Sequence, residues 1–355
     1  MYNIIKRVCF SLLLVSSAQA KVEVIIPNPP SISSESYALL DFETGKILLE
    51  KESDKMLSPA SVTKLMTTYV VLKEVKNTPM TYDDKVKISK KAVFTANSNK
   101  SSRTFLEIGD EVPINDLLKG LIVQSGNDAA IALAEYIAGN EDNFANLMND
   151  YAKRLGMNNS QFRNASGLPI KDHYTTAKDL SILMSQIVRE FPEEYEYYFG
   201  MKSYEYNDIE QKSRNQLLFN YDELFGGKTG WHNTAKYCYT GTIERDGRRL
   251  VIATLKAPES KSRFEDVVAL SNYGYRYFDN HTIVLKGKPI QGINKLPVYM
   301  SDVNNVGVVP NKDITVTLRK GEYEKLKADI NVNDKIIAPF PEGGVVGEIK
   351  ISLND

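Results

Sequence analysis

Cysteine is almost absent from this sequence, with only Cys9 and Cys238 among 355 residues. Cys9 lies in an N-terminal stretch with the features of a secretion signal. Removal of that stretch leaves Cys238 alone and excludes an intramolecular disulfide. Cys238 lies in the strand-like run KYCYTGTI. A thiol in such a run ordinarily packs as a small hydrophobic group, so we expect Cys238 to be structural rather than reactive.

Histidine is also scarce, and neither sign of charge is in excess. The three histidines are His173, His232 and His281, and they lack the spacing of metal ligands. We therefore predict neither a metal site nor a cofactor. Lysine and arginine number 44 against 45 acidic residues, which gives a formal net charge of −1. This balance gives no reason to expect nucleic acid or an anionic membrane surface as a partner.

Beyond the N-terminus the sequence has no apolar run long enough to cross a bilayer as a helix. Residues 1–20, MYNIIKRVCFSLLLVSSAQA, contain two basic residues, then a short apolar run, and end in A-Q-A. This order is typical of a secretory signal peptide. We therefore predict that the mature chain starts near Lys21 and is secreted across the cytoplasmic membrane to the periplasm or cell envelope.

Turn residues and apolar periodicity predict strands at both ends of the first 280 residues and helices between them. Apolar runs around Glu43-Thr44-Gly45 indicate one hairpin, and runs around Asp246-Gly247 indicate another. Helical periodicity marks the segments 60–75, 114–139 (interrupted at 125–127), 140–157, 174–191 and 262–278. We predict an α+β fold, in which an antiparallel sheet carries a helical subdomain.

The texture of the sequence changes at about Thr282. From there short Val- and Ile-rich runs alternate with Gly, Asn, Asp and Pro, which predicts a small all-β domain. The predicted organisation is a signal peptide over 1–20, a main domain over 21–281 and a β-rich C-terminal domain over 282–355.

The stretch SPASVTKLMT places Ser61 three residues before Lys64 at the start of a predicted helix. Residues three apart share a helix face, so the two side chains can meet. A serine hydroxyl is a poor nucleophile unless a base takes its proton. Lysine can be that base only if burial or a neighbouring cation lowers its pKa. Alone, the pattern S-x-x-K is too short to be informative.

Two further short motifs follow. QSGND places Ser125 and Asn127 at the predicted helix break, and GGKTGW places Lys228, Thr229 and Gly230 beside a predicted strand. On its own GGKTG is an ordinary basic turn, and it lacks the G-x-x-x-x-G-K-[ST] spacing of a phosphate loop.

In the order S-x-x-K, S-x-N, K-T-G, about 60 and 100 residues apart, the chain resembles the penicillin-binding, serine-active-site family. Specifically it is similar to the low-molecular-mass D-alanyl-D-alanine carboxypeptidases. The resemblance also includes LLKGLIVQSGNDAAIALAE, NASGLP followed by HYTTAKDL, and the β-rich tail. It implies a β-lactamase/transpeptidase-like domain followed by the small all-β domain.

The resemblance implies a role for each motif residue. Ser61 would attack the terminal D-Ala-D-Ala bond of a peptidoglycan stem peptide and form an acyl-enzyme, and Lys64 would be its base. Ser125 would relay a proton to the leaving nitrogen, and Asn127 would hold the substrate amide and the lysine. β-Lactams would be inhibitors that acylate the same serine.

The third motif would bind the substrate's terminal carboxylate through Lys228 and Thr229. Gly230 would let the substrate backbone approach the strand, since a Cβ would obstruct it. The backbone N–H groups of Ser61 and Trp231 would form the oxyanion hole. Arg263 lies where family members carry an arginine near the carboxylate pocket.

The chain departs from the family pattern in two places. His232 stands where relatives usually carry threonine after K-T-G; we expect it at the rim of the site, and a Ser-His catalytic pair is the alternative. We expect a structural hydrogen bond for His173 and a linker position for His281. The chain ends at Asp355, where relatives continue to a membrane-lying helix, so no membrane anchor is evident in the sequence.

Three other functions compete with the carboxypeptidase. A β-lactamase of class A would carry an E-x-x-L-N segment, and the corresponding GMNNSQFRNASGLP has no glutamate. A D,D-endopeptidase that cuts peptidoglycan cross-links would use the same residues on a related substrate. A catalytically inactive wall-binding scaffold would not depend on Ser61.

Overall fold

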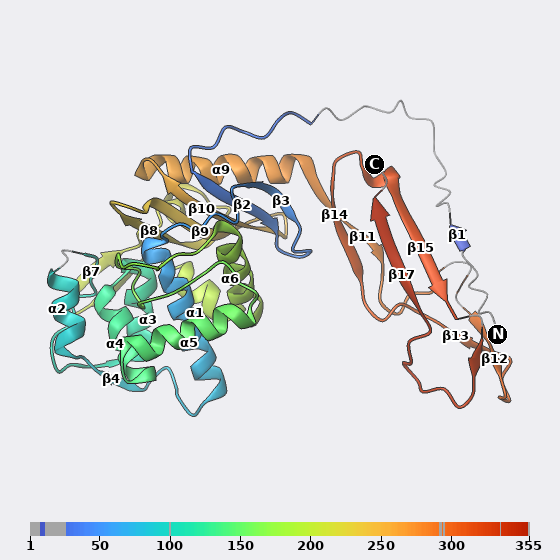
Figure 1. Cartoon of the computed structure of the whole chain (residues 1–355), viewed down its shortest axis with the longest axis horizontal. Helices are drawn as coiled ribbons and strands as arrows, with labels where there is room; N and C mark the ends of the chain where they lie inside the picture. The colour runs from blue at the N-terminus through green and yellow to red at the C-terminus, as the bar shows by residue number, and fades with distance from the viewer. Residues whose placement is uncertain are drawn as a thin grey trace. The chain divides into compact units, whose positions relative to one another are not determined.

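The computed structural model describes residues 8–10, 26–98, 101–290, 293, 295–333 and 335–353. The chain forms two compact units (Figure 1), one spanning Pro29–Gly274 and the other built mainly from the chain after Tyr275. Apart from residues 8–10, the predicted signal peptide and the predicted mature start near Lys21 lie outside the described residues. The division into domains at 281/282 stays a prediction.

The first unit is built on a five-stranded antiparallel sheet of order β3-β2-β10-β9-β8. Its strands are β2 (Ser36–Asp41), β3 (Ile47–Lys51), β8 (Leu224–His232), β9 (Lys236–Arg245) and β10 (Arg248–Ala257). Asp246 and Gly247 adopt φ values of 52° and 75°, the left-handed conformation that a tight hairpin requires. The predicted antiparallel sheet is confirmed, and β8 is its last strand.

Helices cover both faces of this sheet, with α9 on one face and the larger helical layer on the other (Figure 1). Their bounds are α1 (Lys64–Asn77), α2 (Lys90–Ser98), α3 (Ile114–Lys119), α4 (Asn127–Ala138), α5 (Glu141–Arg154), α6 (Ala177–Glu190), α7 (Pro192–Glu194), α8 (Leu217–Asn220) and α9 (Ser260–Tyr277). Among the described residues no helix has both the length and the apolar character needed to cross a membrane.

Two helix interruptions position the site. The helix predicted from residue 60 begins instead with a 3₁₀ turn, η1 (Ala60–Thr63), before α1. The segment 114–139 breaks as predicted: α3 passes into a wide turn, η2 (Gly120–Gln124), and Ser125 takes the left-handed conformation before α4 starts. Wide π-type turns inside helices are frequent at functional sites.

Short elements complete the first unit. They are β4 (Lys85–Lys87) paired with β5 (Glu111–Pro113), β6 (Ser203–Tyr206) paired with β7 (Ile209–Lys212), and the turn η3 (Tyr195–Phe199). The β6–β7 hairpin turns at Asn207 and Asp208, both with positive φ.

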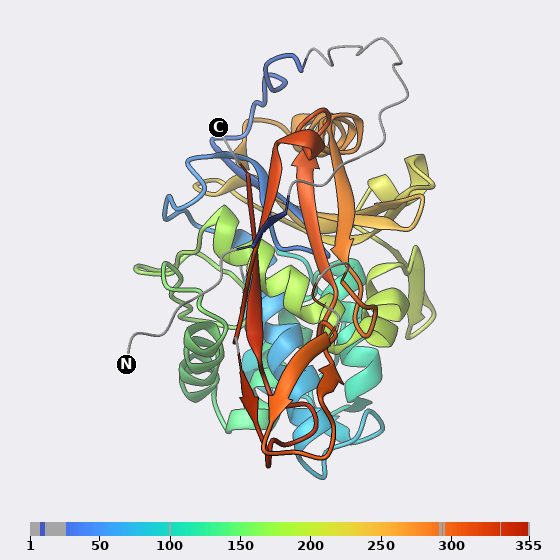
Figure 2. The same ribbon diagram turned by 90° about the vertical axis from the view of Figure 1, so that its right-hand side faces the viewer.

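Beyond the end of α9 at Tyr277, the regular structure among the described residues of the second unit is strand, with one short turn, η4 (Tyr323–Lys325). Its strands are β11 (Phe278–Val284), β12 (Lys295–Tyr299), β13 (Asn305–Gly307), β14 (Ile314–Arg319), β15 (Leu326–Val332), β16 (Ile336–Ile337) and β17 (Gly347–Leu353). β11 pairs with β14, β12 with β13 and β16, and β15 with β17 and with β1 (Val8–Phe10). Figure 2 shows its orange and red strands as long, twisted ribbons. The expectation that His281 lies in a linker is wrong, because it lies within β11.

Candidate active site

Ser61 and Lys64 meet at the junction of η1 and α1. In a 3₁₀ turn the side chains of residues i and i+3 eclipse each other, and here Lys64 Nζ lies 3.0 Å from Ser61 Oγ. Lys64 is fully buried, whereas Ser61 is partly exposed. The structure therefore brings the predicted pair together, with the serine on the accessible side.

Lys64 Nζ has two further partners, and both are acceptors. It lies 2.6 Å from Asn127 Oδ1 and 2.7 Å from the backbone carbonyl of Ser166. A neutral amine has two N–H donors and one lone pair. If the donors go to Asn127 and Ser166, the lone pair faces Ser61 Oγ, which can then donate its proton. The contact geometry therefore suits a neutral lysine acting as a base.

Burial favours the neutral form of the Lys64 amine. Removal from water disfavours an ammonium, and burial lowers the pKa of Lys64 to about 7, against the opposing effect of Asp128 and Glu141. Glu141 also accepts a hydrogen bond from Ala165 N (3.2 Å) and pairs with Lys91 Nζ (3.2 Å). Glu141 is thus an electrostatic influence on Lys64 that the sequence analysis missed.

The carbonyl of Ser166 reaches Lys64 because the loop around it is held against η1 and α1. Thr67 Oγ1 donates to the carbonyl of Ala165 at 2.6 Å. Gly167 has φ +82°, and a Cβ there would lie 1.9 Å from the carbonyl oxygen of Ala60. Only glycine fits this position. Sequence reasoning assigned Ser166 no role, because a contact through a backbone carbonyl leaves no mark in residue type.

Ser125 and Asn127 flank the break between η2 and α4, and both side chains are buried. Asn127 Nδ2 donates to Ser101 Oγ at 2.7 Å. This contact orients the amide so that its oxygen faces Lys64. Ser101 is a second contact that sequence reasoning missed, since nothing in the sequence links it to the S-x-N motif.

Lys228 approaches the same site from β8. Its Nζ donates to Ser125 Oγ at 2.8 Å and to the carbonyl of Thr229 at 3.0 Å, and the side chain is fully buried. The pKa of Lys228 lies well below its ordinary value because of burial and the nearby cations of Lys64, Arg263 and Arg214. An anion entering the site would favour the ammonium form, which has one further N–H to donate.

Gly230 allows β8 to pack directly on η1. A Cβ at Gly230 would lie 2.6 Å from the carbonyl oxygen of Pro59 and 3.1 Å from the backbone nitrogen of Ser61. Its role in the free protein is therefore close packing of protein backbone. Trp231 follows immediately, half exposed, with its ring 5.9 Å from that of Tyr237. The strand that carries the Trp231 amide thus lies beside the amide of Ser61.

Arg263 lies on α9 behind β8 and does not touch Ser61 or Lys64. Its Nη1 donates to the carbonyl of Gly230 at 3.2 Å, and its guanidinium lies 4.5 Å from the ring centroid of Phe264. Burial lowers the pKa of Arg263 to about 10, so it stays a cation at neutral pH. Through the contact with Gly230 it stabilises the position of β8, and its charge adds positive potential near Lys228.

The structure pairs His232 with Ser58 instead of Ser61. Its Nδ1 accepts hydrogen bonds from the backbone N–H groups of Thr234 and Ala235, at 3.2 and 3.1 Å. The proton therefore sits on Nε2, which donates to Ser58 Oγ at 3.1 Å. This arrangement does not support the alternative Ser-His catalytic pair.

His173 and Cys238 have structural surroundings. His173 accepts from Arg163 N and donates to Thr63 Oγ1 at 2.8 Å, and burial lowers its pKa to about 4. Cys238 is fully buried, and burial raises the pKa of its thiol to about 11. Both agree with the structural roles expected for them.

Comparisons with known proteins agree with this geometry. The family described as D-alanyl-D-alanine carboxypeptidase matches residues 23–259, and the family described as penicillin-binding protein 5, C-terminal domain, matches residues 278–355. D-alanyl-D-alanine carboxypeptidase DacC of Escherichia coli (strain K12) is 35% identical over 349 residues, covering 97% of this chain and 86% of the relative. DacF of Bacillus subtilis (strain 168), also a D-alanyl-D-alanine carboxypeptidase, is 29% identical over 348 residues, with 95% and 86% covered.

Among solved structures, penicillin-binding protein 5 from Haemophilus influenzae superimposes with a TM-score of 0.83 at 33% identity. The match covers 92% of this chain and 95% of that chain. Penicillin-binding protein 6B from Escherichia coli gives a TM-score of 0.76 at 32% identity, covering 93% and 94%. The likeness therefore extends over both compact units.

Proposed function

This chain belongs to the D-alanyl-D-alanine carboxypeptidase family and is a serine carboxypeptidase of that family, and from this premise we propose that Ser61 is its nucleophile. The substrate is the terminal D-Ala-D-Ala bond of a peptidoglycan stem pentapeptide. The contacts of Lys64 Nζ are the observation that carries the proposal, because they hold its lone pair toward Ser61 Oγ.

In the proposed acylation, Ser61 Oγ attacks the carbonyl carbon while its proton passes to Lys64. The backbone N–H groups of Ser61 and Trp231 hold the oxyanion that develops. The proton that Lys64 took then passes through the hydroxyl of Ser125 to the leaving D-alanine nitrogen, which leaves Lys64 neutral again; Ser125 Oγ also accepts from Lys228 at 2.8 Å. Water then hydrolyses the acyl-enzyme and releases the shortened peptide.

Recognition of a C-terminal carboxylate is assigned to β8. Lys228 and Thr229 bind the carboxylate, and Arg263 adds positive potential from behind the strand. Because β8 is the last strand of its sheet, an extended peptide can lie alongside it. Lys228 is charged most fully when the carboxylate is present, so binding and charging support each other.

We place the protein in the cell envelope, with the predicted signal peptide over residues 1–20 directing it across the cytoplasmic membrane. Its partners are peptidoglycan stem peptides and β-lactams, which acylate the same serine. Neither nucleic acid nor a membrane anchor enters this proposal.

The decisive experiment measures D-alanine released from a peptide ending in Lys-D-Ala-D-Ala, by the mature protein and by Ser61→Ala. Release by the parent protein alone supports the carboxypeptidase with Ser61 as its nucleophile. Penicillin labelling of Ser61 without release would favour the D,D-endopeptidase. Neither release nor labelling would leave the inactive scaffold.

A further inference from the structure

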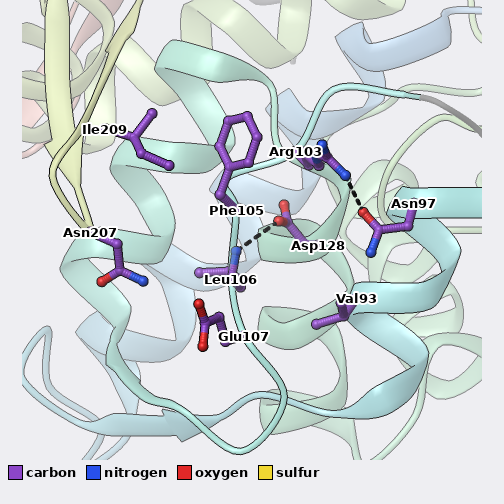
Figure 3. A pocket seen from close by; sticks show the side chains of 9 residues that line it. All are labelled: Val93, Asn97, Arg103, Phe105, Leu106, Glu107, Asp128, Asn207 and Ile209. Atoms are coloured by element: carbon purple, nitrogen blue, oxygen red, sulfur yellow. Dashed lines mark hydrogen bonds between the residues drawn. The ribbon is translucent and has the colours of Figure 1, made fainter.

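A cavity of about 330 Å³ lies in the first unit beside the S-x-N motif (Figure 3). Its walls come from α2, the segment 103–107, the start of α4 and the turn of the β6–β7 hairpin. This volume is in the range of small-ligand sites. Its lining includes the side chains of Asn97, Arg103, Phe105, Glu107 and Asn207.

The cavity shares a wall with the catalytic site. Asn127 Nδ2 donates to Ser101 Oγ (2.7 Å), and Asn127 N donates to the carbonyl of Ser102 (2.9 Å). The next helix residue, Asp128, accepts from the backbone N–H groups of Thr104 (2.8 Å) and Leu106 (3.4 Å). The segment 101–106 therefore contacts the catalytic asparagine at one end and lines the cavity at the other.

Phe105, in the middle of this wall, has a φ of 65°. An aromatic residue rarely adopts this conformation, and it persists only where the surroundings enforce it. Here Asp128 accepts from the backbone N–H groups on both sides of Phe105, and Figure 3 shows its carboxylate beside the segment, bonded to Leu106. The backbone of this wall is therefore held in one conformation by its hydrogen bonds to Asp128.

Two neighbours hold the side chain of Arg103. Its guanidinium lies 4.8 Å from the ring centroid of Phe105, and its Nη1 donates to Asn97 Oδ1. A guanidinium has five N–H donors in a fixed plane, so most remain for a ligand. A cation that two neighbours hold in place is well suited to bind a carboxylate.

Glu107 carries the opposite charge on the same cavity, at the end near Asn207 and away from Arg103 (Figure 3). Neither Arg103 nor Glu107 makes an ion pair with another described residue. The carboxylate of Asp128 is already taken up by backbone N–H groups. The charges open to a ligand are therefore one cation and one anion, which fits a ligand carrying both signs.

We propose that this cavity is a subsite for the part of the stem peptide that precedes the scissile bond. Arg103 binds the free α-carboxylate of the γ-linked glutamate, and Glu107 binds the free amine of the diamino acid that follows it. These two residues come directly before D-Ala-D-Ala. The segment 101–106 runs from the contacts with Asn127 to Arg103 and Phe105 of the cavity, and this connection is why we assign the preceding residues to it. The inference rests on the proposed function.

The test compares two substrates. One is the pentapeptide L-Ala-γ-D-Glu-L-Lys-D-Ala-D-Ala, which carries both charges. The other is diacetyl-L-Lys-D-Ala-D-Ala, which carries neither. Arg103→Gln and Glu107→Gln each should lower kcat/KM for the pentapeptide about tenfold, chiefly through KM, because each removes one charge-assisted contact. Both variants should leave kcat/KM for the diacetyl tripeptide and the rate of penicillin acylation unchanged.

Matched controls are Lys85→Gln and Glu111→Gln, which remove exposed charges on β4 and β5 outside the cavity. Selective loss on the pentapeptide in the two cavity variants alone supports the subsite. An equal loss on both substrates, or no loss on either, overturns it. Tripeptide turnover and penicillin acylation by the parent protein report on the proposed function independently, so the two failures are distinguishable.

Discussion

The surroundings of the two buried lysines differ although their burial is the same. Lys64 and Lys228 are 0% and 1% exposed. Lys64 faces two obligatory acceptors and a serine, with the carboxylates of Asp128 and Glu141 nearby. Lys228 faces a hydroxyl and a carbonyl, with other cations nearby.

This difference teaches that burial alone does not give a lysine its role. Burial lowers the pKa of both side chains, and their partners then decide what each does. The Lys64 region holds a neutral amine that takes a proton, whereas the Lys228 region is a place where an incoming anion restores a positive charge. The same substitution should therefore have a different effect on activity at Lys64 than at Lys228.

The largest expected contrast comes from replacing each lysine by arginine. Lys64→Arg should lower the rate of penicillin acylation by about 10²- to 10⁴-fold, because arginine stays protonated and cannot act as a general base. Lys228→Arg keeps the cation and should cost less than Lys64→Arg. Time courses of penicillin acylation, on variants shown to be folded, measure both rates. Equal losses would contradict the separate roles of Lys64 and Lys228.

A second contrast compares Gly167, in the loop beside Lys64, with Gly230, on the strand that carries Lys228. Gly167→Ala should destabilise the fold by roughly 1–3 kcal/mol from its positive φ alone, with the contact to the Ala60 carbonyl adding to this. Gly230→Ala should cost less, since Gly230 has no positive φ and its Cβ would lie 2.6 Å from the Pro59 carbonyl oxygen, a less severe overlap than at Gly167. Thermal unfolding measures both. A smaller drop in Tm for Gly167→Ala would show that the loop is not held as described.

The charge beside Lys64 provides a smaller, pH-dependent test. Only the neutral amine has a lone pair, so acylation should rise with pH through the pKa of Lys64, about 7. The Glu141 carboxylate raises that pKa, so Glu141→Gln should move the acid limb of the pH–rate profile for acylation to lower pH. Glutamine keeps an acceptor for Ala165 N. Asp142→Asn, exposed on the same helix turn, is the control. An acid limb that does not move in Glu141→Gln would contradict an effect of Glu141 on the pKa of Lys64.

The smallest effect is expected at the rim. His232→Thr should change kcat/KM by less than about threefold, the effect of a hydrogen bond of modest net free energy. The reason is that His232 contacts Ser58 and lies outside the partners of Ser61 and Lys64. D-Alanine release at pH 7 checks this. A loss comparable to that of Lys64→Arg would restore histidine as the base.

The sequence predicted the parts of this site whose chemistry lies in side chains. Ser61, Lys64, Ser125 and Lys228 are residue types with a recognisable order and spacing, and the structure brings them together. The α+β fold followed from turn residues and apolar periodicity. The 3₁₀ start at Ala60 did not, because Ala60 has a positive φ and packs against Gly167, a contact between residues distant in the sequence.

The contacts that were missed have a common physical reason. Ser166 acts through a backbone oxygen, and Glu141 and Ser101 act across distances that only the folded chain closes. The mistaken linker position of His281 arose because a polar strand such as β11 has weak apolar alternation. Patterns of residue type do not record such features.

The Ser166 contact also decides where this sequence is free to vary. Since the peptide carbonyl is the acceptor for Lys64, this contact does not depend on the side chain at position 166, which is buried and whose Oγ accepts from Leu168 N at 3.4 Å. The neighbouring Gly167 has no such freedom, because any Cβ meets the Ala60 carbonyl at 1.9 Å. A saturation library selected for function would therefore accept other small residues at position 166 and stay fixed at position 167.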